Sequence, residues 1–261
     1  MNQQHLNEAA RALWAHFDHA TRFDALPAAC RPDNRADAYA VQREVARLSG
    51  RQVAGWKIAA TSAAGQKHIG VDGPIAARLL SERVIADGLA IPMGSNVMNV
   101  AEAEFAFRMK RALPPRAEPY RSEEVMDAVD TLHLAIEVPD SRYRDFASVG
   151  ALQLIADGAC ASWLVVSGAT PADWRSIDLV GHGVRAYRDG TLAGEGSGAN
   201  VLGDPRIAMT WLANELNGIG EGLQAGHIVT TGACVAPMAV AAGNSMVVDF
   251  GVLGKVQVGF V

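Results

Sequence analysis

The hydrophobic pattern of the chain changes near residue 50, and this change constrains the fold more than any other feature. Before it, apolar residues recur every three or four positions over residues 6–17 and 38–48, which is the period of an amphipathic helix. Asp33 and Asn34 precede the second segment as capping candidates, and Gly50 follows it as a stop. Further along, short apolar runs bounded by Gly, Asp or Pro are typical of strands. Helices first and mainly strands afterwards predict an α+β fold.

The pattern assigns most of the chain to short elements. We expect strands at residues 52–60, 97–108, 132–138, 163–167, 181–188, 227–231 and 246–250. We expect helices at residues 122–130, with Ser122 as N-cap, and 207–216, and a helical turn at residues 76–80. Residues 61–70 fit a short helix or a loop, and residues 151–161 a helix or a buried turn. Asp189-Gly190 favours a type I′ hairpin. The chain divides into a helical or mixed N-terminal region, residues 1–95, and a β-rich core, residues 96–261.

Charge and composition exclude several classes of protein. The 261 residues include 23 Lys and Arg against 28 Asp and Glu, a formal net charge of −5, whereas a nucleic-acid-binding protein needs a basic face. No apolar stretch approaches the roughly 20 residues of a membrane span. The first 20 residues lack the charged and apolar regions of a secretory signal. The 3 cysteines without CxxC spacing suit a reducing compartment. We therefore expect a cytoplasmic protein that binds neither nucleic acid nor membranes.

Two glutamates alternate in the strand-like segment AEAEFAF. Because residues i and i+2 of a strand share a face, Glu102 and Glu104 would lie side by side among apolar neighbours. They fit either a solvent-facing strand edge or a pair of carboxylates that share a cation. Glu137 favours the second interpretation, since it lies within the apolar run of LHLAIEVPDSRY, where an unpaired carboxylate is costly. Three carboxylates without Cys or His suit Mg²⁺ or Mn²⁺ rather than Zn²⁺.

A lone cation lies in another apolar strand-like segment. Lys57, in GWKIAATS, fits a surface lysine whose stem packs along apolar surface while its ammonium reaches water. It equally fits a partly desolvated amine that balances the acids or moves a proton.

Several segments, in this order along the chain, resemble the family of 2-keto-4-pentenoate hydratases and 4-oxalocrotonate decarboxylases. This family belongs to the fumarylacetoacetate-hydrolase-like superfamily. The segments are GWKIAATSAAGQKHIGVDGP (55–74), AEAEFAF (101–107), AIEVPDSRY (135–143), IADGACAS (155–162), GSGANVLGDPRIAMTWLANEL (196–216) and the ending from LQAGHIVTTG to VLGKVQVGF. The resemblance covers residues 50–261.

The resemblance implies a mixed β-roll catalytic core after a smaller helical N-terminal region. It implies a lyase of aromatic catabolism that holds Mg²⁺ or Mn²⁺ on an E-x-E pair and a later glutamate, here Glu102, Glu104 and Glu137. It also implies that Lys57 lies in the active site. Asp72 is a further candidate catalytic residue, and Gln66 is a candidate for substrate binding. The expected partner is a small unsaturated 2-keto acid.

Three positions depart from the family's pattern. Hydratases of the family usually carry an acid after the proline of the VDxP motif, where this chain has Ile75. The usual TGS triplet ends in Ala233, and Ile-Ala-Ala follows Lys57 instead of Ile-Gly-Leu. We expect a hydratase acting on 2-hydroxypenta-2,4-dienoate first and a 4-oxalocrotonate-type decarboxylase second. A carbon–carbon hydrolase of the superfamily, or a non-catalytic partner subunit of a hydratase–decarboxylase complex, are the remaining alternatives.

The implied mechanism begins with an unsaturated 2-keto acid whose carboxylate and 2-oxo oxygens bind the metal, so that a dienolate is stabilised at that end. Lys57 would donate or accept the proton of the keto–enol step, or stabilise negative charge. Hydration and decarboxylation share this electron sink, and sequence therefore separates them poorly. The family habit predicts a homo-oligomer, with a complex to a related hydratase or decarboxylase as an option.

Overall fold

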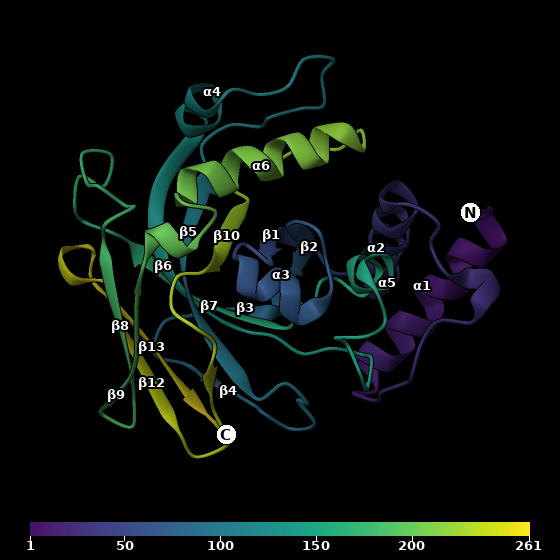
Figure 1. Cartoon of the computed structure of the whole chain (residues 1–261), viewed down its shortest axis with the longest axis horizontal. Helices are drawn as coiled ribbons and strands as arrows, with labels where there is room; N and C mark the ends of the chain where they lie inside the picture. Colours follow the sequence, from purple (N-terminus) through teal and green to yellow (C-terminus); the bar gives the residue numbers. More distant parts are fainter.

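The computed structural model describes residues 1–261 and places the two amphipathic segments in helices that pack together at one end of the molecule (Figure 1). Helix α1 (Gln3–Asp18) turns the apolar stripe that includes Ala9 and Leu13 toward the core. Helix α2 (Arg35–Ser49) begins at Asn34, whose side chain caps it, and ends at Gly50 in a left-handed conformation. The short helix α5 (Ala151–Ala156) packs against α2. Both predicted N-terminal helices are therefore confirmed.

An eight-stranded mixed sheet forms the centre of the molecule. Its strand order is β2-β1-β10-β5-β6-β7-β3, and β11 pairs with β5. The strands are β1 (Val53–Ala59), β2 (Ile75–Leu80), β3 (Val84–Ala86), β5 (Val100–Met109), β6 (Val129–Val138), β7 (Trp163–Ala169), β10 (Ile228–Ala233) and β11 (Met238–Ala239). Strands from both sides of residue 95 share this sheet, since β1 pairs in parallel with β10. The division of the chain after residue 95 stays a prediction, and one continuous sheet crosses it.

A second sheet of five strands has the order β4-β13-β12-β8-β9. Its strands are β4 (Ala90–Ile91), β8 (Gly183–Arg188), β9 (Thr191–Ser197), β12 (Ser245–Asp249) and β13 (Lys255–Phe260). The β8–β9 hairpin turns at Asp189 and Gly190, whose φ angles of 51° and 77° match the type I′ turn that the sequence predicts.

Three further helices complete the fold. They are α3 (Ala63–Ile69), α4 (Ser122–Asp127) and α6 (Pro205–Gly218), which begins at the Asp204 cap and packs on α4 and β10. In Figure 1 the sheets curl, and α6 lies across one end of β10. One large cluster of buried apolar side chains joins the N-terminal helices, α6 and both sheets. The predicted α+β class, with most strands in the second part of the chain, is confirmed.

Two local predictions are wrong. Residues 76–80 form strand β2 and not a helical turn, because five of the six residues of β2 are buried and the run pairs with β1. The helix at residue 122 is capped at Arg121, whose N–H donates to the Glu124 carboxylate at 3.0 Å, and not at Ser122. It ends at Asp127, since Val129 already belongs to β6.

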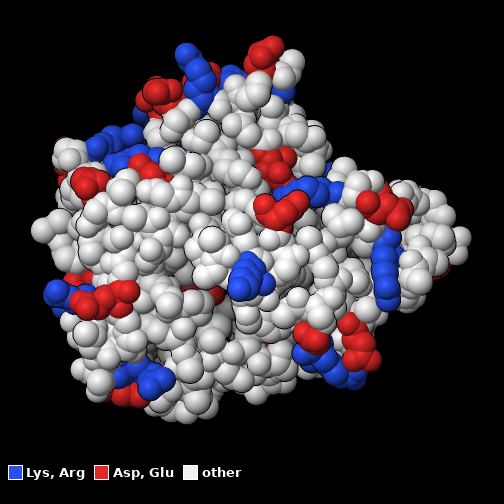
Figure 2. All heavy atoms as spheres, in the orientation of Figure 1, with Lys and Arg blue, Asp and Glu red and all other residues white.

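One face of the molecule agrees with the charge balance of the sequence. Lys, Arg, Asp and Glu side chains are interspersed on the face shown in Figure 2, which carries no broad basic patch. None of the helices combines the length and the apolar character that crossing a bilayer requires.

Candidate metal centre

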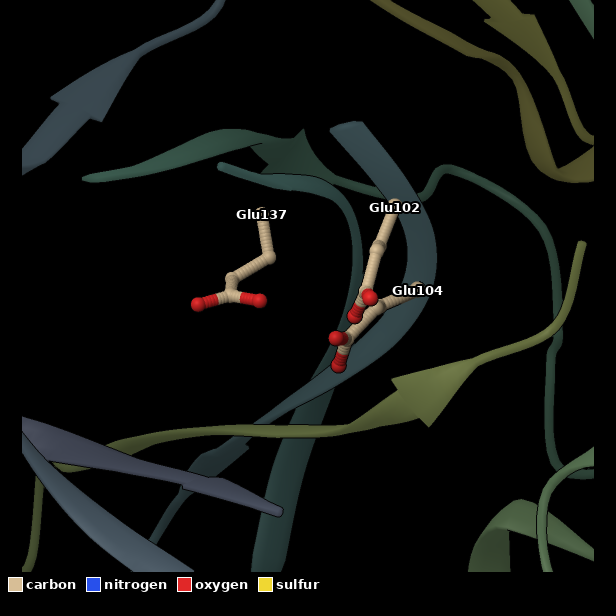
Figure 3. Close-up of side chains that lie close together, drawn as sticks. All are labelled: Glu102, Glu104 and Glu137. Carbon is tan, nitrogen blue, oxygen red and sulfur yellow. The ribbon is translucent and has the colours of Figure 1, made fainter. Parts of the chain in front are cut away.

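The pairing of β5 with β6 brings three carboxylates together. The two strands are antiparallel, and Glu102 lies directly opposite Glu137. Glu104 shares the face of Glu102 because it lies two residues further along the same strand. Oxygen atoms of the three side chains lie within 4.8 Å of one another, and Figure 3 shows the carboxyl groups turned toward a common space. We call these three residues the carboxylate triad.

The triad lies inside the protein. Glu104 and Glu137 are both 0% exposed, and Glu102 is half-buried. Glu104 Oε2 accepts a hydrogen bond of 2.7 Å from the N–H of Gly232. Glu104 Oε1 and Glu137 Oε1 have no hydrogen-bond partner. Because buried carboxylate oxygens without partners are costly, and because oxygen donors suit hard divalent ions, the residues present fit Mg²⁺ or Mn²⁺. A solvent-facing strand edge is therefore the wrong interpretation of Glu104.

Burial also changes the proton affinity of the triad. It raises the pKa of Glu104 to about 7, with repulsion from Glu102 adding to the effect and Lys57 opposing it. Burial likewise raises the pKa of Glu137 well above its ordinary value, against the attraction of Lys57. In the absence of a cation, the triad therefore holds protons that a surface cluster of glutamates would release.

Lys57 is the cation that faces the triad. It lies on β1, where its side chain is 3% exposed, and its Nζ is 3.3 Å from Glu137 Oε2. The ammonium also donates a hydrogen bond of 3.1 Å to the carbonyl of Ala159. Burial by itself would lower the pKa of Lys57, but the charges of the triad outweigh burial and raise that pKa. The interpretation of Lys57 as a solvated surface lysine does not hold.

Asp72 and Gln66 both lie in the segment that connects β1 to β2. Asp72 is exposed and lies between α3 and β2. Gln66, on α3, donates to the carbonyl of Ala60 at 3.1 Å. No hydrogen bond or ion pair joins either residue to the three glutamates, and their catalytic and substrate-binding roles stay predictions.

Two of the three departures from the family's pattern, Ile75 and Ala233, lie in different surroundings. Ile75 is 0% exposed and pairs with Ala59 at the start of β2, so the position of the missing acid is part of the core. Ala233, where the missing hydroxyl would be, is the cross-strand partner of Glu104. This second departure therefore changes the immediate surroundings of the triad.

Two backbone groups contribute to the site, and sequence reasoning missed both. They are the Gly232 N–H and the Ala159 carbonyl. Gly232 has a φ of 102°, and a Cβ added to it would lie 2.1 Å from Oγ1 of Thr61. The glycine in the TTGA segment is thus the only sign of the Gly232 N–H in the sequence. The Ala159 carbonyl has no such sign, because every residue has a main-chain carbonyl.

Curated relatives match most of the chain. A 2-keto-4-pentenoate hydratase of Burkholderia vietnamiensis is 35% identical over 226 residues, which is 85% of this chain and 85% of the relative. A 4-oxalocrotonate decarboxylase of Pseudomonas putida is 33% identical over 229 residues, 87% of this chain and 85% of the relative. The chain belongs to this hydratase and decarboxylase family. The resemblance predicted from the sequence is confirmed, and both named activities are those of lyases.

Solved structures agree with the family at the level of the whole chain. A 4-oxalocrotonate decarboxylase from Pseudomonas putida, complexed with magnesium and adipate, superposes with a TM-score of 0.90 at 28% identity, over 100% of this chain and 99% of that one. A fumarylpyruvate hydrolase from Pseudomonas aeruginosa, in complex with Mn²⁺ and pyruvate, has a TM-score of 0.58 at 18% identity. The superposition covers 79% of this chain and 88% of that one, and it shows the shared fold alone. No known family profile matches the chain.

Proposed function

We propose that this family member is a metal-dependent hydratase that adds water to an unsaturated 2-keto acid such as 2-hydroxypenta-2,4-dienoate, in the catabolism of aromatic compounds. The observation that carries the proposal is the buried carboxylate triad with Lys57 beside it. Hydratases among the curated relatives support the same reaction. Mg²⁺ or Mn²⁺, held by Glu102, Glu104 and Glu137, would supply Lewis-acid stabilisation of the negative charge at the keto-acid end of the substrate.

Lys57 would hold or move the proton of the reaction. Its ammonium has three N–H groups, of which two face Glu137 and the Ala159 carbonyl. One N–H is then left for an oxygen of the substrate. A buried ammonium in this position stabilises negative charge as it develops, and it can pass a proton in the keto–enol step.

A 4-oxalocrotonate-type decarboxylase is the second candidate, and Ile75 favours it. The family resemblance gives hydratases an acid at this position, whereas Ile75 is an apolar residue buried in the core. If this chain is a hydratase, it therefore needs another group to activate water. A decarboxylase does not need this group. The decarboxylase that superposes over the whole chain supports the same alternative.

A product assay with two substrates in parallel tests the proposal. The protein is given 2-hydroxypenta-2,4-dienoate and 4-oxalocrotonate separately, each with Mg²⁺, and the Glu104→Gln variant is the matched control. The proposal predicts a 4-hydroxy-2-keto acid from the first substrate and no product with the variant. Release of CO₂ from the second substrate alone would reverse the order of the two candidates. Turnover of neither substrate, with the metal bound, would favour the non-catalytic partner subunit.

We also propose that the enzyme works as a cytoplasmic homo-oligomer. All three cysteines are free and buried, which suits the reducing compartment expected from the sequence. Light scattering on the purified protein measures its mass directly, and a monomer at enzyme-assay concentrations would contradict the proposal.

A further inference from the structure

The carbonyl that holds Lys57 belongs to a strained turn. Gly158, Ala159 and Cys160 follow α5, and all three have positive φ, at 78°, 45° and 61°. Only the first is a glycine, and side-chain-bearing residues reach this region of φ at a cost in backbone strain. Such strain persists where the surrounding structure holds the backbone in place. The turn therefore needs contacts that keep the Ala159 carbonyl directed at Lys57.

An ion pair between Arg142 and Asp157 supplies those contacts. The Arg142 guanidinium donates to both the carboxylate and the main-chain carbonyl of Asp157, at the start of the turn. It also donates to the carbonyl of Ala161, at the end of the turn, at 3.0 Å. One side chain thus holds the backbone on both sides of residues 158–160.

The acid of the pair is fixed in turn by the segment that follows β6. Asp157 Oδ2 accepts hydrogen bonds from Ser141 Oγ at 3.0 Å and from the Arg142 N–H at 3.2 Å. The main-chain N–H of Asp140 donates to the Cys160 carbonyl at 2.9 Å. Because this segment continues directly from the strand that carries Glu137, the turn is tied to the same strand as the triad.

The pair is buried and yet separate from the triad. Arg142 is 4% exposed and Asp157 is 5% exposed. Neither forms a hydrogen bond or an ion pair with Glu102, Glu104 or Glu137. Lys57 is the one side chain of the site that the turn contacts by a hydrogen bond, through the Ala159 carbonyl at 3.1 Å.

We infer that Arg142 and Asp157 are positioning residues for Lys57. Their ion pair holds the turn at residues 158–160 in its left-handed conformation, so that the Ala159 carbonyl fixes the Lys57 ammonium against Glu137. The inference rests on the proposed function in one respect, since a kinetic effect requires that Lys57 act on the substrate. The position of the ammonium itself does not depend on that function.

The sequence offers a direct way to observe Lys57. The chain has only 4 lysines, and the other three, Lys67, Lys110 and Lys255, are exposed. An amine-reactive reagent followed by mass spectrometry of peptides therefore compares one buried lysine with three internal references in the same sample. Metal-loaded wild-type protein should label quickly at the three references and slowly at Lys57.

The test uses Asp157→Asn and Arg142→Lys, which we call the clamp variants, with Glu215→Gln as matched control. The control removes a partly buried ion pair, in which Arg35 and Glu215 are 2.6 Å apart, and this pair forms no hydrogen bond or ion pair with Lys57 or the turn. Both clamp variants should raise the labelling of Lys57 about tenfold relative to the references, through local opening of the turn. They should lower kcat about 100-fold with KM within about twofold of wild type, because the reacting group is misplaced. A lysine at position 142 cannot reproduce the forked contacts of arginine.

A merely structural role predicts a different result. In that case the clamp variants and the control would lose similar amounts of unfolding free energy in urea. The labelling of Lys57 and the kcat would then be the same in the clamp variants as in the control. That result, or wild-type kcat and wild-type labelling in folded Asp157→Asn, would overturn the inference. Should both clamp variants fail to fold, Ser141→Ala carries the same test, since it removes one hydrogen bond to Asp157 and should raise Lys57 labelling by a smaller factor.

The assay separates this inference from the proposed function. Lys57→Met is measured beside the clamp variants with 2-hydroxypenta-2,4-dienoate and with 4-oxalocrotonate. Wild-type kcat in Lys57→Met would contradict the proposed role of Lys57, while faster labelling in Asp157→Asn would still support the positioning of its ammonium. A large loss of kcat in Lys57→Met together with none in Asp157→Asn would contradict the positioning alone.

Discussion

At the residue scale, glutamates of this chain show how surroundings decide the behaviour of one side-chain type. Glu124 lies on the surface, where hydrogen bonds from the Arg116 guanidinium lower its pKa to about 2. Glu104 lies in the core, where burial raises its pKa to about 7. The first is a stable anion without any cation from solution, whereas the second needs a proton or a metal ion.

Binding of Mg²⁺ should therefore release protons and strengthen with pH. The pKa of Glu104 in the metal-free protein, about 7, lies above its ordinary value of 4.5, so the site holds a proton between these pH values. Each step of one pH unit below about 7 should weaken Mg²⁺ binding up to about tenfold, because the ion must displace that proton. Calorimetric titrations in buffers of different ionisation enthalpy, at about pH 6 and about pH 8, measure both effects. Equal affinity at the two pH values, without proton release, would contradict the account.

The raised pKa of Glu104 also decides whether the metal-free protein gains or loses stability as pH rises. At pH values between the ordinary pKa of Glu104 and the raised one, Glu104 holds a proton in the folded metal-free protein and has lost it in the unfolded chain. The contribution of Glu104 to the free energy of unfolding should therefore fall as pH rises from about 4.5 to about 7. Glu104→Gln, which cannot titrate, should lack this contribution in urea unfolding of metal-free protein. A wild-type contribution that rises with pH over this range would contradict the assigned shift.

Removal of the Lys57 ammonium should impair chemistry more than metal binding. We expect Lys57→Met to lower kcat about 100-fold or more, the usual size of a lost proton-transfer group, with Mg²⁺ still bound. Lys67→Met is the control, since Lys67 is exposed on α3. Steady-state kinetics with a parallel metal titration check this. Loss of metal binding with unchanged turnover per bound metal would assign Lys57 a role in the metal site instead.

At the element scale, strand pairing puts the functional groups together. Lys57 reaches the triad because β1 pairs with β10 and β10 pairs with β5. The β1–β10 pair requires a close approach at Gly55, where a Cβ would lie 1.8 Å from the Ile228 carbonyl oxygen. The glycine is therefore a requirement of the sheet.

Gly55→Ala should destabilise the protein by more than about 3 kcal/mol, since the added atom meets backbone that cannot move aside. Gly168→Ala is the matched control, because Gly168 also lies in a strand, β7, and has no atom near its added Cβ. The control should change the free energy of unfolding by less than about 1 kcal/mol. Urea unfolding of the two variants makes the comparison, and similar midpoints would contradict the packing argument.

The strands also show what the sequence could predict. The alternation of Glu102 and Glu104 places both on one face of a strand by its period alone. The register that sets Glu102 opposite Glu137 could not be predicted, since it depends on pairing between segments separated by a helix and a loop. The helical turn predicted at residues 76–80, which lie in β2, is wrong for a related reason. Its residues are buried on both faces, and periodicity alone does not distinguish such a strand from a buried helical turn.

At the scale of the whole molecule, the site joins segments from most of the chain. Lys57 lies in the first quarter, and the Gly232 N–H comes from close to the C-terminus. The sequence drew attention to Lys57 and to the glutamates of the triad, because a lone Lys or Glu is conspicuous in an apolar run, but it gave no sign that Arg142 and Asp157 are also buried. It could not predict the contacts made by the Gly232 N–H and the Ala159 carbonyl, since backbone groups acquire a role only when the fold is complete.

Because the site unites distant segments, metal binding should stabilise the whole fold. At a Mg²⁺ concentration about 100 times its Kd, the gain should be about 2.7 kcal/mol, which raises Tm by about 5–10 °C for a chain of this size. Thermal unfolding with and without Mg²⁺ measures the shift. Glu104→Gln should show little of it, and an equal rise in both proteins would place the stabilising ion elsewhere.

The central claim is that Glu102, Glu104 and Glu137 hold a divalent cation, and titration of metal-free protein with Mn²⁺ or Mg²⁺ tests it most directly. Wild-type protein and Glu195→Gln, an exposed acid changed in the same way, should bind one ion per chain with equal affinity. Glu104→Gln keeps the shape of the side chain and should bind the ion at least about 100-fold more weakly. Equal and negligible binding in wild type and Glu104→Gln would contradict the metal centre and the metal-dependent lyase built on it.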